Sequence, residues 1–390
     1  MRSIESICAT VGEDIPSATR PLTAPIYQNS VFEAESLEQI DAIYEGRVDG
    51  DLYSRESNPN VSILERVMAE LEGADDAVAF SSGMAAIGGT LLSLVDAGDR
   101  IVAGTELYGG TNVLLRQHLN RFGVETEFVD FCDLAAVRRA FDGQPKLALA
   151  ESITNPLLRV PDIEAISELA SPAGVKVLVD NTLATPMLLR PLVFGADVVV
   201  HSTTKSLGGH SDVTGGVAVA NFELTSAIHQ SARVWGSVPD PFAAWLTVRG
   251  IRTLPLRVDR ACENAMAVAD FLSTRSDIRH VHYPGIRSHP QHDLARAALG
   301  GRFSGMVTFD LADGLHAASA FVRGFEAIKL APSLGERRTT ISHPAKTSHR
   351  SLSADERAEL GISDGLIRMS CGIESAADIV ADIAQALSRS

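Results

Sequence analysis

The segment HSTTKSLGGHSDVTGG, residues 201–216, directly follows the apolar run Val198–Val200 and contains a single lysine, Lys205. An apolar run of this kind predicts a buried strand, and a lysine at its end is costly without a partner or a function. One explanation is a lysine whose stem packs on apolar surface while its ammonium reaches water or a carboxylate. The other is a desolvated amine of lowered pKa, which is a nucleophile suited to a Schiff base. The hydroxyl residues before Lys205 and the glycines after it favour the second explanation.

Short apolar stretches alternate with helical stretches on the N-terminal side of this segment. The apolar stretches are AVAF (77–80), RIVAG (100–104), TEFVD (126–130), LALAES (147–152), VKVLVDNT (175–182) and DVVVHSTTK (197–205). Strands that are apolar on both faces and alternate with helices indicate an α/β fold with a mostly parallel sheet covered on both sides. In such sheets, functional sites lie at the C-terminal ends of the strands. Lys205 is therefore expected beside the polar ends of the other strands.

The chain divides into three parts by its pattern. Residues 1–55 carry several prolines and predict an extended arm with one short helix around residues 36–44. Residues 56–253 hold the alternating pattern, which begins with a helix that ends at Gly73. A long helical region, 243–273, crosses the boundary that we expect near Leu254. Residues 254–390 then predict a smaller α+β unit.

Composition excludes several classes of function. The formal net charge of −15 argues against a basic field for nucleic acid or anionic membrane. No apolar run reaches the roughly 18 residues that a membrane span needs, and the N-terminus has no apolar signal core. We therefore expect a cytoplasmic protein. No CxxC or HExxH pattern occurs, so no metal site is predicted. We expect free thiols in a reducing compartment at Cys8, Cys132, Cys262 and Cys371.

Asp180 ends the stretch VKVLVD, 25 residues before Lys205. An aspartate at a strand end is often only a turn residue or a helix cap. A carboxylate beside a Schiff-base lysine is also what pyridoxal 5′-phosphate (PLP) requires. The cofactor acts as an electron sink while its pyridine nitrogen stays protonated, and a carboxylate keeps it so. Asp180 is thus a candidate partner of that nitrogen.

The segment FSSGMAA, residues 80–86, turns from a strand into a helix. Backbone N–H groups at a helix N-terminus bind phosphate. A plain strand–helix turn explains this segment equally well when it is taken alone. The hydroxyls of Ser202 and Thr204 are suited to completing a phosphate site.

Several ordered motifs span nearly the whole chain. They are YSRESNP (53–59), FSSGMAA (80–86), LYGGT (107–111), ESITNP (151–156), VDNT (179–182), HSTTKSLGGHSD (201–212), PSLGE (332–336) and IRMSCGIE (367–374). With these motifs the sequence resembles the Cys/Met-metabolism family of PLP enzymes, of fold type I. The family includes cystathionine γ-synthase, cystathionine γ- and β-lyases, methionine γ-lyase and the O-acylhomoserine sulfhydrylases. The resemblance implies a mostly parallel sheet of the seven-stranded type, a smaller C-terminal α+β domain and an N-terminal arm.

The resemblance also implies roles for single residues. Lys205 matches the Schiff-base lysine, Asp180 the partner of the pyridine nitrogen, and Tyr108 the ring-stacking tyrosine and candidate proton carrier. The implied phosphate ligands are Gly83, Met84, Ser202 and Thr204, together with Tyr53 and Arg55 of the neighbouring subunit. The implied substrate-carboxylate ligands are Arg368, Ser333 and Asn155, which also lies near the cofactor hydroxyl. A site shared in this way implies at least a homodimer, and usually a homotetramer of two such dimers.

The implied reaction is a PLP-dependent γ-elimination or γ-replacement on an amino acid. Family members that handle cystathionine typically have polar residues at three positions, which are apolar here: Leu52, Val113 and Pro332. Neutral drift is one explanation. The other is a preference for substrates without a distal amino acid, which favours a methionine γ-lyase-like enzyme. Cystathionine γ-synthase, O-acylhomoserine sulfhydrylase and cystathionine γ-lyase remain alternatives. A non-catalytic member is disfavoured by Lys205 and Asp180, and an aminotransferase or a decarboxylase by YSRESNP and LYGGT.

Overall fold

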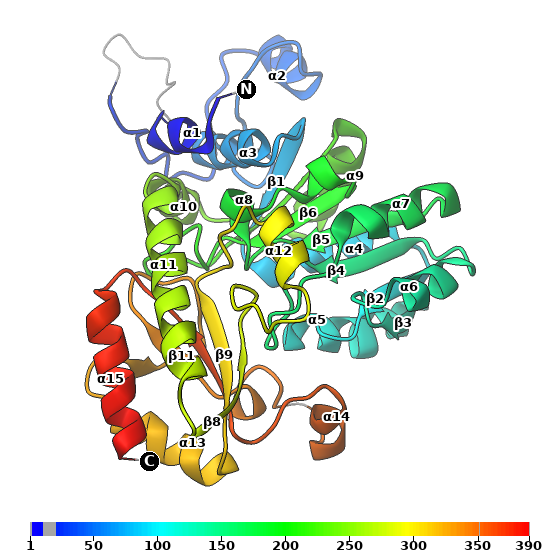
Figure 1. Ribbon diagram of the computed structural model, residues 1–390. Helices are drawn as coiled ribbons and strands as arrows, with labels where there is room; N and C mark the ends of the chain where they lie inside the picture. Colours follow the sequence, from blue (N-terminus) through cyan, green and yellow to red (C-terminus); the bar gives the residue numbers. More distant parts are fainter. Residues whose placement is uncertain (1, 11–20, 351, 390) are drawn as a thin grey trace.

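The computed structural model describes residues 2–10, 21–350 and 352–389. It contains two sheets, each with its own helices, which lie one above the other in Figure 1. Helix α11 (Leu254–Ser273) descends from the upper layer alongside the lower sheet. It starts at the residue where the sequence pattern changes, and we propose Leu254 as the domain boundary.

The larger sheet has seven strands and is mostly parallel, as predicted. Its order is β1 (Asp76–Phe80), β7 (Gly216–Ala220), β6 (Val198–Ser202), β5 (Lys176–Asp180), β4 (Leu147–Glu151), β2 (Arg100–Gly104) and β3 (Glu125–Val129). Only β7 runs antiparallel to its neighbours, β1 and β6. Alternate residues face different clusters of buried side chains: Val177 and Val179 one cluster, Leu178 the other. Both faces are thus covered, which explains the continuous apolar runs.

Helices cover both faces of this sheet. One face carries α3 (Pro59–Glu72), α6 (Leu134–Phe141), α7 (Ile163–Ala173) and α10 (Pro241–Ile251). The other carries α4 (Gly83–Leu94), α9 (Phe222–Trp235) and α5 (Gly109–Val113) with its π and 3-10 continuations, Leu114–His118 and Leu119–Phe122. The short α8 (Thr185–Leu188) and a 3-10 turn, Pro191–Phe194, lie in the connection from β5 to β6. Helix α3 ends, as predicted, at Gly73, which is left-handed (φ 77°).

The smaller sheet has five strands. Its order is β10 (Lys329–Leu330), β11 (Thr340–Ser342), β12 (Leu366–Ser370), β9 (Met306–Leu311) and β8 (Ile278–His282). The remaining helices of this unit are α12 (His292–Ala298), α13 (Gly314–Gly324), α14 (Ala354–Glu359) and α15 (Ala376–Ser388), with a 3-10 turn at Pro344–Lys346. This is an α+β arrangement, as the sequence pattern predicts.

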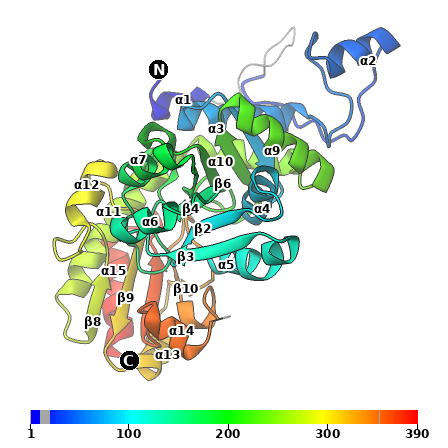
Figure 2. The same ribbon diagram turned by 90° about the vertical axis from the view of Figure 1, so that its right-hand side faces the viewer.

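Two local expectations need correction. The predicted continuous helix over 243–273 is two helices, α10 and α11, because Pro255 has no N–H to donate and fits only a first helical turn. The arm holds the predicted helix, α2 (Leu37–Tyr44) with Ser36 as its N-cap, but also α1 (Ile4–Thr10), which buries Ile7 and Cys8. Figure 2 shows α2 projecting away from the sheets.

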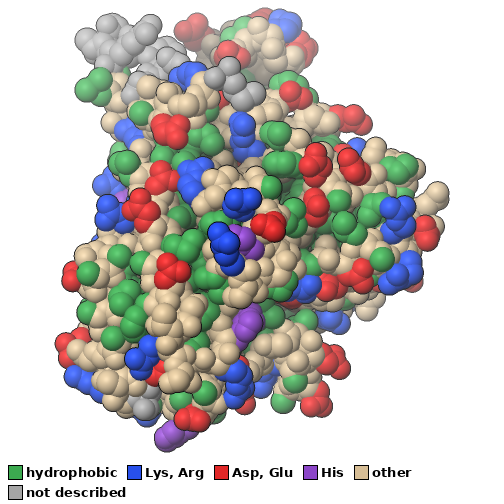
Figure 3. Space-filling model, in the orientation of Figure 1, with side chains coloured by type: hydrophobic (Ala, Val, Ile, Leu, Met, Phe, Trp, Pro, Cys, Tyr) green, Lys and Arg blue, Asp and Glu red, His purple; other side chains and the backbone are tan. Residues whose placement is uncertain are grey.

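All four cysteines are free thiols, as expected. No helix in residues 2–10, 21–350 and 352–389 is long and apolar enough to cross a membrane. Acidic and basic side chains are interspersed over the face in Figure 3.

Candidate active site

Three neighbouring strands bring polar residues to one edge of the large sheet. Glu151 ends β4, Asp180 ends β5 and Ser202 ends β6, while Lys205 follows in the turn after β6. Glu151 and Asp180 are register partners, and Asp180 pairs with Val200 two residues before Ser202. The parallel ladder therefore sets these side chains side by side, where sites in open α/β sheets form.

Lys205 differs from every other lysine of the chain in its burial. It is half-buried, whereas all the others are exposed: Lys146, Lys176, Lys329 and Lys346. Its Nζ donates to the Ser333 hydroxyl at 3.3 Å. Burial lowers the pKa of Lys205, and the charge of Arg368 lowers it further, against the opposing charge of Glu336. A lysine in this state is a better nucleophile than an exposed one.

Asp180 accepts a hydrogen bond from the Thr182 backbone N–H at 3.0 Å. Burial is the largest cause that raises the pKa of this carboxyl, and bonds from Thr182 oppose it. A half-buried carboxyl group with one backbone donor is suited to a cationic partner. A protonated pyridine nitrogen has that chemistry.

The N-terminus of α4 packs against the end of β6. Ser82 caps this helix by accepting from the Ala85 N–H at 3.0 Å. A Cβ at position 83 would lie 2.6 Å from the Cβ of Ser202, so only glycine fits there. The N-terminus of α4 and Ser202 thus lie together, as a phosphate site requires. The Thr204 hydroxyl, two residues after Ser202 in the chain, bonds the carbonyl and the N–H of Gly215.

Arg368 lies on β12 of the smaller sheet and is 5% exposed. Its Nη1 donates to Asn155 Oδ1 at 2.9 Å and its Nη2 to the Ser333 carbonyl at 3.4 Å. Its buried Nε has no hydrogen-bond partner among the described residues. Burial lowers the pKa of Arg368 to about 10, which still leaves it cationic at neutral pH. A fixed guanidinium of this kind suits a carboxylate.

Tyr108 begins α5, and its ring is 45% exposed. Its backbone N–H donates to Glu151 Oε1 at 2.6 Å. The Tyr108 ring and the Met84 sulfur both lie over Gly110, where a Cβ would come within 2.7 Å and 3.0 Å of them. The side chains of Tyr108 and Met84 are therefore neighbours.

Tyr53 and Arg55 lie apart from this cluster within one chain. Tyr53 is 42% exposed, and Arg55 stacks over its ring at 5.3 Å. Arg55 Nη1 donates to the Arg233 carbonyl at the end of α9 and pairs with Glu56 at 3.0 Å. Leu52, on the same arm, is half-buried. No contact of Tyr53 or Arg55 with Lys205 occurs within the described chain.

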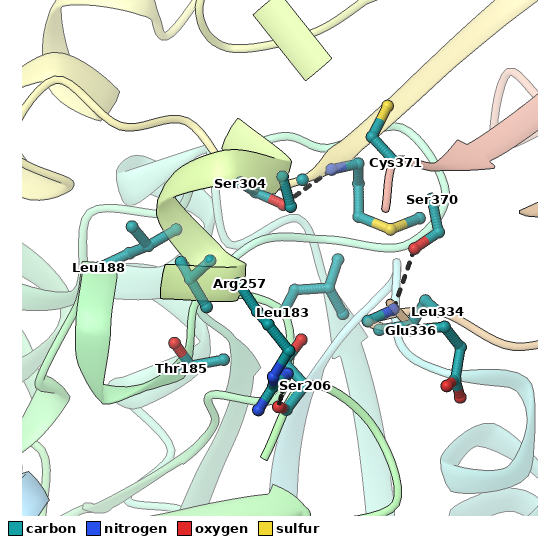
Figure 4. Close-up of a pocket in the computed structure, with 15 residues that line it drawn as sticks. Leu183, Thr185, Leu188, Ser206, Arg257, Ser304, Leu334, Glu336, Ser370 and Cys371 are labelled. Atoms are coloured by element: carbon teal, nitrogen blue, oxygen red, sulfur yellow. Dashed lines mark hydrogen bonds between the residues drawn. The ribbon is translucent and has the colours of Figure 1, made fainter. Parts of the chain in front are cut away.

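Two supporting residues, Arg257 and Glu151, were not predicted from the sequence. Arg257 of α11 donates from Nη1 to the carbonyl of Ser206, the residue after Lys205, at 2.7 Å (Figure 4). Both line a cavity with Glu336 and Ser370. Gly335 closes the same junction, since a Cβ there would lie 2.4 Å from the Ser206 hydroxyl. The turn that carries Lys205 is thus held from the smaller unit.

The second residue is Glu151, within the motif ESITNP. Its place at a strand end, like that of Asp180, is the signal that could have revealed it. The histidine of HSTTK, His201, lies on the opposite face of the sheet, where its Nε2 contacts Glu72 Oε1 at 2.6 Å. No group of three potential metal ligands occurs in residues 2–10, 21–350 and 352–389.

These features fit PLP: a half-buried lysine, a half-buried aspartate, a helix N-terminus with Gly83 against Ser202, and a fixed arginine. A family model described as "Cys/Met metabolism PLP-dependent enzyme" matches residues 5–388. The chain belongs to this PLP-dependent family. Its members are lyases and transferases of cysteine and methionine metabolism, so the protein is an enzyme of this kind with PLP as its cofactor.

Similar proteins within this PLP-dependent family carry different names. L-methionine gamma-lyase of Pseudomonas putida is 40% identical over 95% of this chain and 93% of its own. Cystathionine gamma-lyase of Bacillus subtilis is 41% identical over 95% of both chains. The crystal structure of cystathionine gamma synthase from Xanthomonas oryzae pv. oryzae, in complex with aminoacrylate and cysteine, has a TM-score of 0.95 at 37% identity and covers 100% of this chain and 98% of that one. The fold is that of fold type I PLP enzymes.

Proposed function

We propose that this enzyme catalyses γ-elimination on a γ-substituted L-amino acid that lacks a second amino-acid group at its far end, as a methionine γ-lyase does. L-Methionine and water would then give methanethiol, 2-oxobutanoate and ammonia. The observation that carries the proposal is the apolar character of Leu52, Val113 and Pro332. The relatives alone support elimination and replacement equally.

Different residues of this chain would bind the substrate and transfer its protons. PLP, when bound, supplies the electron sink for negative charge at the substrate α-carbon. Arg368, with Asn155 and Ser333, would bind the substrate carboxylate and orient its α-carbon. The amine of Lys205, whose pKa burial lowers, would remove the α-proton. Tyr108 is the second group placed to carry a proton, here to or from the leaving group.

The far end of the substrate meets apolar residues in this proposal. Val113 ends α5, the helix that Tyr108 begins, and Pro332 precedes Ser333, which bonds Lys205. A distal ammonium and carboxylate would be poorly paired against these side chains, at a cost of about 1–3 kcal/mol per group. The nearby Arg116 lies over the Phe128 ring at 3.9 Å. Glu336 lines the cavity shared with Arg257, and its negative charge acts on both Lys205 and Arg257.

A substrate comparison tests this proposal. We expect kcat/KM for L-methionine to exceed that for L-cystathionine by at least about tenfold, the factor that corresponds to one poorly paired group. Release of 2-oxobutanoate on one enzyme preparation would be followed for both. In the matched variant Val113→Arg, the ratio of kcat/KM for L-methionine to that for L-cystathionine should be smaller, because the arginine supplies a cation for the distal carboxylate of cystathionine. A preference for cystathionine in the wild-type enzyme would contradict the proposal.

Replacement of a γ-substituent is the second candidate. The similarity to a cystathionine gamma synthase structure supports it. An O-acylhomoserine supplied with a thiol would then give a new thioether amino acid instead of 2-oxobutanoate. The ratio of these two products on the same preparation separates the candidates.

We further propose that a second copy of the chain completes each site, in a homodimer or a dimer of such dimers. Tyr53 and Arg55 are exposed and lie away from Lys205 in their own chain. The arm and the two ends of α9 expose large apolar side chains that a second copy would bury: Leu22, Val31, Leu37, Tyr44, Phe222, Val234 and Trp235. Exposed apolar groups of this size are typical of an interface.

Subunit mixing tests the shared site. Arg55→Ala and Lys205→Ala homo-oligomers should each be inactive or nearly so. Mixed dimers would contain one site with both defects and one intact site, so we expect recovery of up to about a quarter of wild-type activity in a random mixture of the two. Mass spectrometry of the intact complexes would verify that mixing occurred. Mixed dimers without any recovery would contradict the arrangement.

A further inference from the structure

Two acidic side chains lie side by side at the edge of the large sheet. Glu151 and Asp180 are register partners at the ends of β4 and β5. Neighbouring strands lie about 4.8 Å apart, and register partners point to the same face. Glu151 is 5% exposed. Asp180 is half-buried. Two carboxyl groups this close, one of them buried, are not both ionised, because like charges repel strongly where water is largely excluded.

The hydrogen bonds of Glu151 are unequal. Oε1 accepts from the Tyr108 backbone N–H at 2.6 Å, while the buried Oε2 has no hydrogen-bond partner among the described residues. An unpartnered oxygen of an ionised carboxylate would bear the full desolvation cost of a charge. A neutral carboxyl group at the same place costs much less. The hydrogen bonds thus favour Glu151 as the protonated member of the pair.

The charged groups that face Glu151 act in the same direction on balance. Burial is the largest cause that raises the pKa of Glu151, and the charge of Asp180 is the next. Glu106, in the segment after β2, adds a second negative charge. Arg368 on β12 opposes them, but its effect is smaller than that of Asp180, and its hydrogen bonds go to Asn155 and Ser333. The pKa of Glu151 therefore lies well above its usual range.

We propose that Glu151 is a positioning residue that stays protonated in the folded enzyme: its neutral carboxyl group holds the backbone at Tyr108 and leaves the negative charge of the pair on Asp180. The inference rests on the roles proposed for Asp180 and Tyr108. An ionised Asp180 is what a protonated pyridine nitrogen needs. A second ionised carboxylate beside Asp180 would compete with it for the proton of the pyridine nitrogen.

The test uses Glu151→Gln, which keeps the acceptor for Tyr108 and cannot ionise, and Glu151→Ala, which removes the acceptor. Glu106→Gln is the matched control, because Glu106 accepts from Arg159 and Thr154 at 2.7 Å each and is ion-paired. The first readout is the infrared C=O stretch of protonated carboxyl groups in the PLP-free protein at pH 7. We expect Glu151→Gln to remove one such band and Glu106→Gln to remove none. A wild-type spectrum that lacks this band would overturn the proposal.

The second readout is the melting temperature of the PLP-free protein against pH. A carboxyl group whose pKa is raised by folding stabilises the fold below its unfolded pKa, about 4.3, and loses that contribution as pH rises towards its folded pKa. The melting temperature of Glu151→Gln minus that of the wild type should therefore increase as pH rises from 4 to 8. A constant or shrinking difference would mean an ionised Glu151 and would contradict the proposal. Neither readout depends on the substrate or the reaction.

The third readout is PLP affinity. Loss of the Tyr108 acceptor in Glu151→Ala is expected to weaken PLP binding by about 5-fold to 150-fold, the range for one unsatisfied buried group. Glutamine should restore most of what alanine loses. If glutamine fails to restore binding, a negative charge at position 151 is required and the proposal is wrong. If Glu151→Ala does not fold, the infrared and melting data on Glu151→Gln still decide.

Discussion

Replacing Lys205 with alanine is expected to lower the turnover of every amino-acid substrate by about 10³-fold or more. The proposed role of its amine is to carry the proton of the substrate α-carbon, and loss of a positioned acid–base group costs about 10²–10⁴-fold. Loss of the covalent attachment of PLP adds to this effect. Turnover and the exchange of the α-proton of L-alanine with deuterated water would both be measured. Exchange reports proton removal even where no leaving group is present.

The control for this variant is Lys176→Ala on the same sheet. Lys176 is exposed and pairs with Asp197 at 2.8 Å. An exposed ion pair contributes about 0–1 kcal/mol, so this variant should keep its turnover and its PLP. A Lys205→Ala protein that still exchanged the α-proton at the wild-type rate would show that another group removes it.

Replacing Arg368 with alanine is expected to produce the second largest effect. Truncation of one partner of a buried, hydrogen-bonded charge pair costs about 2–5 kcal/mol, or roughly 30-fold to several thousand-fold in kcat/KM. Arg368→Lys should recover little, because an ammonium cannot reproduce the guanidinium fork that also holds Asn155. The decrease in kcat/KM on Arg368→Ala should be smaller for an amine substrate without a carboxylate than for the amino acid.

Folding of the Arg368 variants has to be checked separately, because the arginine is buried and bonds both Asn155 and Ser333. Circular dichroism and PLP content serve for this. Arg260→Ala is the control, since Arg260 is exposed and pairs with Glu263 one turn further along the same helix. An Arg368→Ala enzyme with unchanged kcat/KM for the carboxylate substrate would remove Arg368 from the substrate site.

The sequence predicts most of the fold because most strands of the large sheet are short and mainly apolar. The large sheet is buried on both faces. Its strands therefore form apolar runs, such as Val198–Val200, which differ clearly in sequence from the helices between them. Two expectations failed for different reasons. Pro255 breaks an otherwise helical stretch. Helix α1 has only 7 residues, too few to show a clear helical period in the sequence.

The candidate site was predictable where a residue ends a strand or stands in a recognisable motif. Lys205 and Asp180 meet both conditions, and the structure brings Lys205 to Ser333 and Arg368 to Asn155, over 100 residues away in each case. Arg257 and Glu151 were not predicted as supporting residues, because their partners are a backbone carbonyl and a backbone N–H. The Arg257 bond follows from the packing of the two units, which a single sequence does not show. The Glu151 bond lies within the large unit, and only the strand-end position of Glu151 points to it.

The most direct test of the PLP assignment is peptide mapping of the purified enzyme after reduction with borohydride. We expect one phosphopyridoxyl group per chain, on Lys205. A group on one of the exposed lysines, Lys146, Lys176, Lys329 or Lys346, or a protein that takes up PLP without any reducible bond, would contradict it.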